Sequence, residues 1–175
     1  MGTIMMSRER TYMLRIEPGP GQESVWDYPR PPRVVPDSRL VRITFGGEVI
    51  AETVRSMRVL ETSQAPAFYL PPEDVDLDLL RPSDHRQTFC EWKGIASYVD
   101  IVTNAGVSVA AGWTYPEPTP PFRMIAGWFA FYCGRVGDAT VGGVEVNAND
   151  GDFYGGWITP EVVGPFKGGA GTSGW

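Results

Sequence analysis

A short stretch near the middle of the chain, FCEWKGIASYVDI at residues 89–101, places a thiol, a carboxylate, an indole and an amine in consecutive positions. A cysteine acts as a nucleophile when a neighbouring base lowers its pKa. The only histidine of the chain, His85, lies five residues before Cys90 and could be that base. Glu91 opposes thiolate formation, because it adds negative charge beside the sulfur. Cys90 and His85 are therefore candidate catalytic residues, and whether the chain is an enzyme stays open.

Tryptophan and tyrosine side chains are concentrated in and beside the central segments of the chain. Each carries a polar atom that needs a hydrogen-bond partner when it is buried. A cluster of them forms either a polar-tipped core or the wall of a ligand pocket, and both interpretations remain open. The pocket hypothesis predicts a small-molecule ligand, heterocyclic or nucleotide-like, bound by Glu61, Trp92, Lys93, Tyr98, Trp113 and Tyr115.

The pocket hypothesis depends most on Lys93. Side chains alternate along a strand, so Trp92 and Lys93 can share one space only where the ladder bends. Gly94 favours such a bend, because a glycine lets the backbone approach a neighbour closely. We expect Lys93 to point into a cavity walled by Trp113 and Tyr98. The alternative is a solvated lysine at the start of a strand.

The sequence contains no complete set of metal ligands. His85, Cys90 and Cys133 could supply three ligands, whereas a structural zinc site takes four, and the chain has no C-x-x-C pair. We therefore expect neither a bound metal nor a cofactor.

The elements that must position these residues have the pattern of short strands. Residues 39–53 alternate in polarity on either side of a Gly-Gly pair, which is typical of a tight hairpin. Prolines bound one short helix at about residues 72–80. A second hairpin and further strands are expected at 94–102 with 106–115, and at 55–62, 67–70, 127–136 and 142–146. This pattern predicts a mainly β fold, a single antiparallel β domain.

Proline and glycine set both ends of the chain apart from its middle. Residues 1–36 are predicted to form a Pro/Gly-rich N-terminal arm, residues 37–147 the β domain, and residues 148–175 a Gly-rich C-terminal tail packed on the domain. Within the arm, residues 17–36 should be extended rather than a strand or helix. The arm either lies on its own domain, with Trp26 as an anchor, or acts as an interaction module for a proline-binding partner.

Composition narrows the class of partner. The 175 residues include 15 Lys and Arg against 21 Asp and Glu, a net charge of −6, which argues against binding to duplex nucleic acid. No stretch approaches the roughly 20 apolar residues of a membrane span, and the first residues lack the apolar region of a signal peptide. Two cysteines are too few for a secreted disulfide scaffold. We expect a cytoplasmic protein without a membrane partner, and the sequence does not indicate its oligomeric state.

Several segments together resemble one bacterial family, the domain of unknown function (DUF) 427. They are VRITFGGEVIAET (41–53), FYLPPEDV (68–75), FCEWKG (89–94), AGWTYPEP (111–118), IAGWFAFY (125–132) and FYGGWITPEVVGPFKGG (153–169). The resemblance extends over residues 24–175 and implies a β-tent-like architecture, but no activity. The family has also been linked to nucleotidyl transfer, which needs carboxylates that hold two metal ions. Asp76 and Asp78 have the spacing for this, but on the predicted helix they lie about 200° apart.

Overall fold

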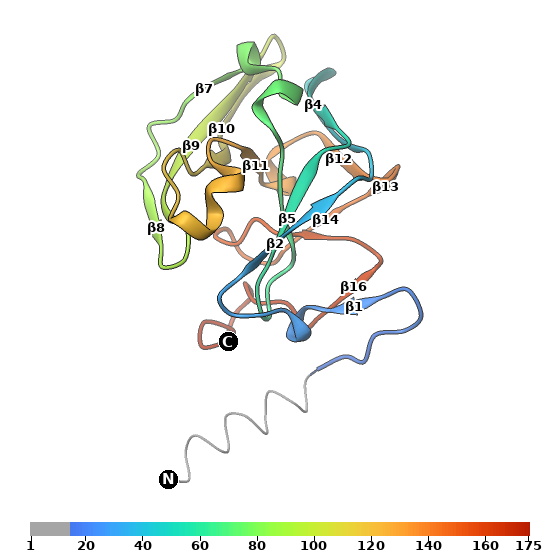
Figure 1. The fold of residues 1–175 in the computed structure, drawn as a ribbon. Helices are drawn as coiled ribbons and strands as arrows, with labels where there is room; N and C mark the ends of the chain where they lie inside the picture. Colours follow the sequence, from blue (N-terminus) through green and yellow to red (C-terminus); the bar gives the residue numbers. More distant parts are fainter. Residues whose placement is uncertain (1–14) are drawn as a thin grey trace.

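The computed structural model describes residues 15–175, which form a mainly β protein with several small sheets (Figure 1). The largest sheet has the order β11-β10-β9-β7, with β8 also paired to β9. Its strands are β7 (Leu80–Pro82), β8 (Thr88–Cys90), β9 (Gly94–Thr103), β10 (Gly106–Thr114) and β11 (Phe129–Phe131). The predicted mainly β fold with antiparallel sheets is confirmed.

Two further sheets and two isolated strand pairs complete the described part of the chain. One sheet has the order β13-β12-β3-β4, from β3 (Val41–Phe45), β4 (Glu48–Thr53), β12 (Asp138–Val141) and β13 (Val144–Glu145). The other has the order β2-β5-β6, from β2 (Arg33–Asp37), β5 (Ser56–Leu60) and β6 (Ala67–Tyr69). The two pairs are β1 (Glu23–Ser24) with β16 (Val162–Val163), which is parallel, and β14 (Asn147–Ala148) with β15 (Trp157–Ile158), which is antiparallel.

Both predicted hairpins are present. β3 and β4 are joined at Gly46-Gly47, whose φ values of 58° and 82° lie in the left-handed region that glycine adopts without strain. β9 and β10 are antiparallel neighbours, and Thr103 pairs with Gly106 at their turn. Local turn chemistry and alternating polarity therefore predicted these two connections correctly.

Some elements differ from the predictions. The helix expected at about 72–80 is two separate 3-10 helices, η2 (Pro72–Asp74) and η3 (Leu77–Leu79). The strand expected over 127–136 is limited to β11 and is followed by η5 (Cys133–Arg135), while η4 (Pro120–Ile125) precedes it. The prediction that 17–36 contains no strand or helix is wrong, because β1, η1 (Val25–Asp27) and β2 form there. β2 tolerates Pro36 because it is an edge strand, paired with β5 on one side only.

The residues around β11 point alternately into two hydrophobic clusters. Phe129 and Phe131 pack in the cluster that contains Val41, Ile43 and Ile101, whereas Trp128 and Tyr132 pack in a second, aromatic cluster. Consecutive side chains of a strand point to opposite faces, which accounts for this separation. The aromatic cluster also contains Tyr69, Tyr98, Trp113 and Tyr115.

The arm and the tail lie side by side, below the sheets in the view of Figure 1, where β1 pairs with β16. The indole N–H of Trp26 donates to the carbonyl oxygen of Pro165 over 2.9 Å, and its ring meets Trp175 edge-on at 5.3 Å. Trp157 is 1 % exposed and stacks on Phe68 at 5.1 Å. Residues 1–14 of the predicted arm lie outside the described residues.

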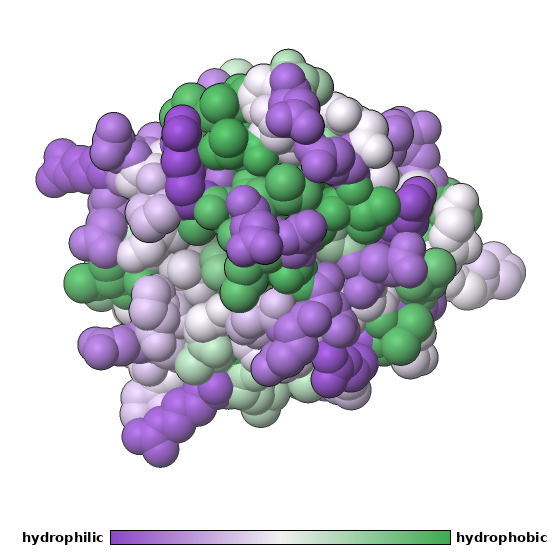
Figure 2. Space-filling view, turned by 90° about the horizontal axis from the view of Figure 1, so that it is seen from above, coloured by the Kyte–Doolittle hydropathy of each residue, from purple (hydrophilic) through white to green (hydrophobic). Residues whose placement is uncertain are grey.

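Seen from above, on the face where β4 and β7 end, apolar side chains gather in the middle with hydrophilic ones lying across them (Figure 2). Among residues 15–175, no helix has the length and the apolar character that a membrane crossing requires.

Candidate functional site

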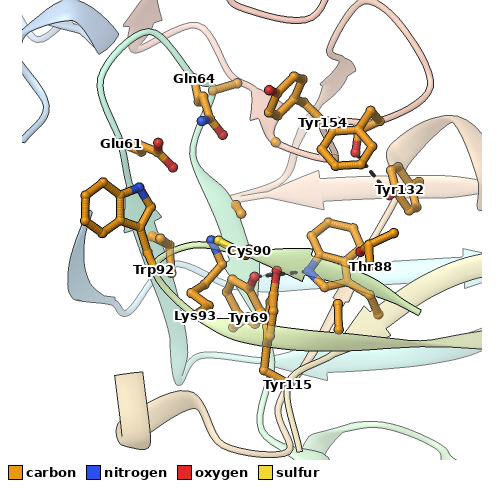
Figure 3. Close-up of a pocket in the computed structure, with 18 of the residues that line it drawn as sticks. Glu61, Gln64, Tyr69, Thr88, Cys90, Trp92, Lys93, Tyr115, Tyr132 and Tyr154 are labelled. Carbon is orange, nitrogen blue, oxygen red and sulfur yellow. Dashed lines mark hydrogen bonds between the residues drawn. The ribbon is translucent and has the colours of Figure 1, made fainter. Parts of the chain in front are cut away.

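A cavity of about 390 Å³ opens between the β8–β9 hairpin, β10, the segment around β5 and β6, and the tail (Figure 3). Nine of its 22 lining residues are aromatic, and the rings come from distant parts of the sequence. Tyr69 lies on β6, Trp113 on β10, Tyr132 after β11, and Tyr154 in the tail. The cavity is thus assembled only when the tail packs on the sheets.

All six residues predicted to bind a ligand line this one cavity. Cys90, the candidate nucleophile, lines it as well. His85 does not: its ring packs 4.4 Å from that of Tyr98, and its Nδ1 lies 2.8 Å from the carbonyl oxygen of Arg86. No hydrogen bond joins His85 to Cys90 in the described part of the chain, so the candidate catalytic pair is not assembled. The six residues are Glu61, Trp92, Lys93, Tyr98, Trp113 and Tyr115.

Trp92 and Lys93 reach the cavity together because they lie in a turn. Cys90 pairs with Gly94 across the β8–β9 hairpin, and residues 91–93 form the turn between them. Gly94 has a φ of 101°, which a residue with a side chain rarely adopts. The expected bend within one strand is therefore a hairpin turn, since β8 supplies a strand that sequence patterns did not indicate.

The loop after β10 holds this turn in place. The backbone N–H of Thr119 donates to the carbonyl oxygen of Lys93 over 3.1 Å, and the Thr119 hydroxyl donates to the carbonyl oxygen of Trp92. The carbonyl groups of Trp92 and Lys93 are thus held from outside the hairpin, which fixes the backbone from which the two side chains extend.

Hydrogen bonds between wall residues satisfy several of the aromatic polar atoms. The Trp113 indole N–H donates to the Tyr69 hydroxyl over 3.0 Å, and the Tyr98 hydroxyl lies 2.8 Å from the Thr88 hydroxyl. The Tyr132 hydroxyl donates to the Phe153 carbonyl oxygen over 3.1 Å. Burial raises the pKa of both Tyr69 and Tyr115, so these phenols are neutral at neutral pH.

Lys93 supplies a positive charge inside this aromatic wall. Its Nζ lies 5.5 Å from the centre of the Tyr115 ring and 6.0 Å from that of Phe122, within the range of cation–π attraction. Burial by itself lowers the pKa of Lys93, but nearby groups, among them the Glu61 carboxylate and the hydrogen-bonded Cys90 side chain, outweigh it and raise that pKa above its ordinary value. The amine is therefore an ammonium at neutral pH.

Two further polar groups lie at the edge of the cavity, the Glu61 carboxylate and the Trp92 indole N–H. The Glu61 carboxylate lies 3.5 Å from Nε of Arg30 and faces the cavity. The indole nitrogen of Trp92 is buried and has no hydrogen-bond partner among the described residues. Figure 3 shows this nitrogen on the side of its ring that faces Glu61.

Sequence patterns missed several residues of the wall. Tyr69 follows Phe68 on a short strand, so the two side chains must face opposite sides of the sheet. This alternation does not predict which residues Tyr69 contacts. Gln64, Tyr154 and Lys167 come from a loop and from the tail, where no periodicity exists to place a side chain.

Among residues 15–175, no group of three or more His, Cys, Asp or Glu side chains could hold a metal ion. Asp76 and Asp78 lie at η3, outside the cavity.

The fold and the cavity define a small β protein with an aromatic, lysine-bearing pocket. The model of the family described as a domain of unknown function (DUF427) matches residues 33–142. The chain therefore belongs to the DUF427 family, as the resemblance predicted. No curated protein matches the chain. Most of the cavity wall falls within the matched residues, whereas Phe153, Tyr154 and Lys167 lie beyond them.

Proposed function

We propose that this protein binds a small planar ligand, heterocyclic or nucleotide-like, in the aromatic cavity. The observation that carries the proposal is Lys93, an ammonium group held within an aromatic wall beside a hollow of about 390 Å³. A hollow of that size falls within the usual range for small-molecule sites, about 300–1,000 Å³. Trp and Tyr rings that line a cavity favour stacking with a planar ring.

The alternative is that these rings only form a core with polar tips. It accounts for Tyr69 and Trp113, because the Trp113 indole N–H donates to the Tyr69 hydroxyl. It does not account for Trp92, whose buried indole N–H is unpaired among the described residues. Nor does it account for Lys93, a half-buried cation on the cavity wall that forms no ion pair among residues 15–175. Both features favour a ligand over a filled core.

The first test is native mass spectrometry of freshly purified protein, followed by a thermal-shift screen of metabolites. We expect a carried-over or screened compound that raises the melting temperature and quenches tryptophan emission. The variant Lys93→Met should weaken binding more than tenfold, which corresponds to about 1.5–3 kcal/mol. Arg42→Met is the matched control, because Arg42 is an exposed cation on β3, outside the cavity. Equal affinity in the parent and in Lys93→Met would contradict the proposal that Lys93 contacts the ligand.

A further inference from the structure

The charges around the cavity are not balanced within it. Four charged side chains line it, and three of them either have a partner or are exposed to solvent. Glu61 lies 3.5 Å from Arg30, the Lys167 ammonium donates to the carbonyl oxygen of Trp175 over 2.9 Å, and Glu91 is exposed to solvent. The fourth, Lys93, forms no ion pair with any residue of the described part of the chain. This ammonium group thus has no direct ion pair, and the Glu61 carboxylate acts on it only from beyond ion-pair distance.

A second donor beside Lys93 is also unpaired. The indole N–H of Trp92 is buried without an acceptor among the described residues, and a buried donor left unpaired destabilises a protein. Trp92 and Lys93 are consecutive in one turn, and Thr119 fixes the peptide oxygens of both. Figure 3 shows Trp92 and Lys93 on the same side of the cavity, next to Glu61 and Cys90.

The positive charge of Lys93 also limits which ligands the aromatic wall can bind. Aromatic pockets often hold cationic ligands, which sit over the face of a Tyr or Trp ring. Here the ammonium of Lys93 lies near the face of Tyr115, so a cationic ligand would meet a like charge there. Glu61 offers it little compensation, because its carboxylate already has Arg30 as a partner.

We propose that the ligand is a planar anion whose acidic group is bound by the Lys93 ammonium and the Trp92 indole N–H, while its ring lies along the aromatic wall. A carboxylate or a phosphate has enough acceptor atoms to satisfy both donors. This inference rests on the proposed function and narrows it to one chemical class. The raised pKa of Lys93 supports it, because the amine keeps its proton while the site is empty.

Matched sets of probes that differ only in charge test this inference. The probes are pyridine, quinoline and purine rings, each carrying a carboxylate, a carboxamide or an aminomethyl group. Dissociation constants are measured at neutral pH by tryptophan fluorescence and by ligand-observed NMR. We expect the carboxylate of at least one ring to bind more than tenfold tighter than its carboxamide, and the aminomethyl compound to bind weakest.

Variants then assign the preference to individual donors. Lys93→Met should remove the preference for the carboxylate, whereas Lys93→Arg should keep most of it. Trp92→Phe keeps an aromatic ring, smaller than the indole, but removes the N–H, so it should weaken binding of the carboxylate probe severalfold and affect the carboxamide of the same ring less. Glu61→Gln should tighten carboxylate binding, because it removes a negative charge beside the site. Melting curves of each variant confirm that it is folded, and Lys93→Gln replaces Lys93→Met if the latter does not fold.

The outcomes separate this inference from the proposed function. If the carboxylate and carboxamide of every ring bind equally well, and Lys93→Met binds them as the parent does, the ligand is not selected as an anion, although the cavity binds planar rings. If the aminomethyl compounds bind tightest and Glu61→Gln abolishes their binding, the cavity selects cations. If no probe of any charge binds to the folded parent and the metabolite screen is also empty, the proposed function itself is wrong.

Discussion

The indole N–H of Trp113 donates to the hydroxyl of Tyr69 over 3.0 Å, and the two rings meet edge-on at 6.2 Å. Tyr69 lies on β6 and Trp113 on β10, so this bond joins two different sheets across the aromatic cluster. Both side chains are buried, at 1 % and 8 % exposure. The bond therefore sets the positions of two rings of the cavity wall relative to one another.

Replacing Tyr69 by Phe should destabilise the protein by about 1–3 kcal/mol, because the Trp113 N–H is left unpaired in a buried position. Urea denaturation at neutral pH measures the change. Tyr98→Phe is the control: its hydroxyl partner Thr88 is only partly buried and can turn to water, so the expected loss is about 0.5–1.5 kcal/mol. A smaller loss for Tyr69→Phe than for Tyr98→Phe would contradict this account of the bond.

Sequence patterns predict the parts of this fold that depend on neighbouring residues. The β3–β4 hairpin follows from Gly46-Gly47 between alternating strands, and the opposite faces of Phe131 and Tyr132 follow from a period of two. Both features can be predicted from neighbouring residues alone, without knowing which residues pack against them.

The β8–β9 hairpin shows where such patterns fail. β8 is only three residues long, and its turn, residues 91–93, contains none of the glycine or asparagine pairs that mark tight turns. Trp92 and Lys93 were nevertheless predicted to share one space, from their residue types and from Gly94. The wall residues Tyr69 and Tyr154 could not be predicted, because their contacts with Trp113 and its neighbours come from packing between segments far apart in the sequence.

The tail should contribute strongly to stability through Trp157. Its ring stacks on Phe68, and its indole N–H donates to the Phe131 carbonyl oxygen over 2.8 Å. Trp157→Ala should cost about 3–5 kcal/mol of unfolding free energy, as expected for removal of a buried large aromatic ring. Trp175→Ala removes an edge-on contact with Trp26 at a partly exposed position, and should cost about 0.5–1.5 kcal/mol. Urea denaturation compares the two, and similar small losses would show that the tail packs loosely.

Stability should fall in acid partly through Asp37. Burial by itself raises the pKa of this carboxyl, but hydrogen bonds from the side chain and backbone of Arg39, together with the charge of Arg58, outweigh it and hold the pKa below its ordinary value. A carboxylate whose pKa is depressed in the folded state stabilises the protein above the ordinary Asp value of about 3.9. That stabilisation is lost as the pH falls through the lower, folded-state pKa.

Asp37→Asn should therefore be less stable than the parent near neutral pH, by about 1.5–3 kcal/mol. The difference should shrink as the pH falls below about 4. Thermal melts between neutral pH and strong acid measure it. Asp84→Asn serves as the control for the loss of one negative charge, because Asp84 is exposed and has no ion pair within residues 15–175. A difference between the parent and Asp37→Asn that stays constant down to strong acid would contradict the role given to the Arg39 and Arg58 contacts.

The shape of the cavity should depend on Gly155, where the tail meets Trp113. A Cβ at this position would overlap the outer atoms of the Trp113 ring, and one at Gly156 would overlap the carbonyl oxygen of Ala65. Gly155→Ala therefore forces either the tail or the indole to move. We expect a loss of about 1–3 kcal/mol of unfolding free energy, and a shift in tryptophan emission as the Trp113 environment changes.

Gly174→Ala is the matched control, because nothing lies within 4 Å of a Cβ built there and its φ is not in the left-handed region. It should leave both the melting temperature and the emission spectrum unchanged. The two variants also separate stability from ligand binding. If the tail forms part of the ligand site, Gly155→Ala should weaken any ligand found by the screen even at temperatures where the variant is fully folded. Unchanged affinity in folded Gly155→Ala would show that the ligand is held by the β8–β9 hairpin and β10 without help from the tail.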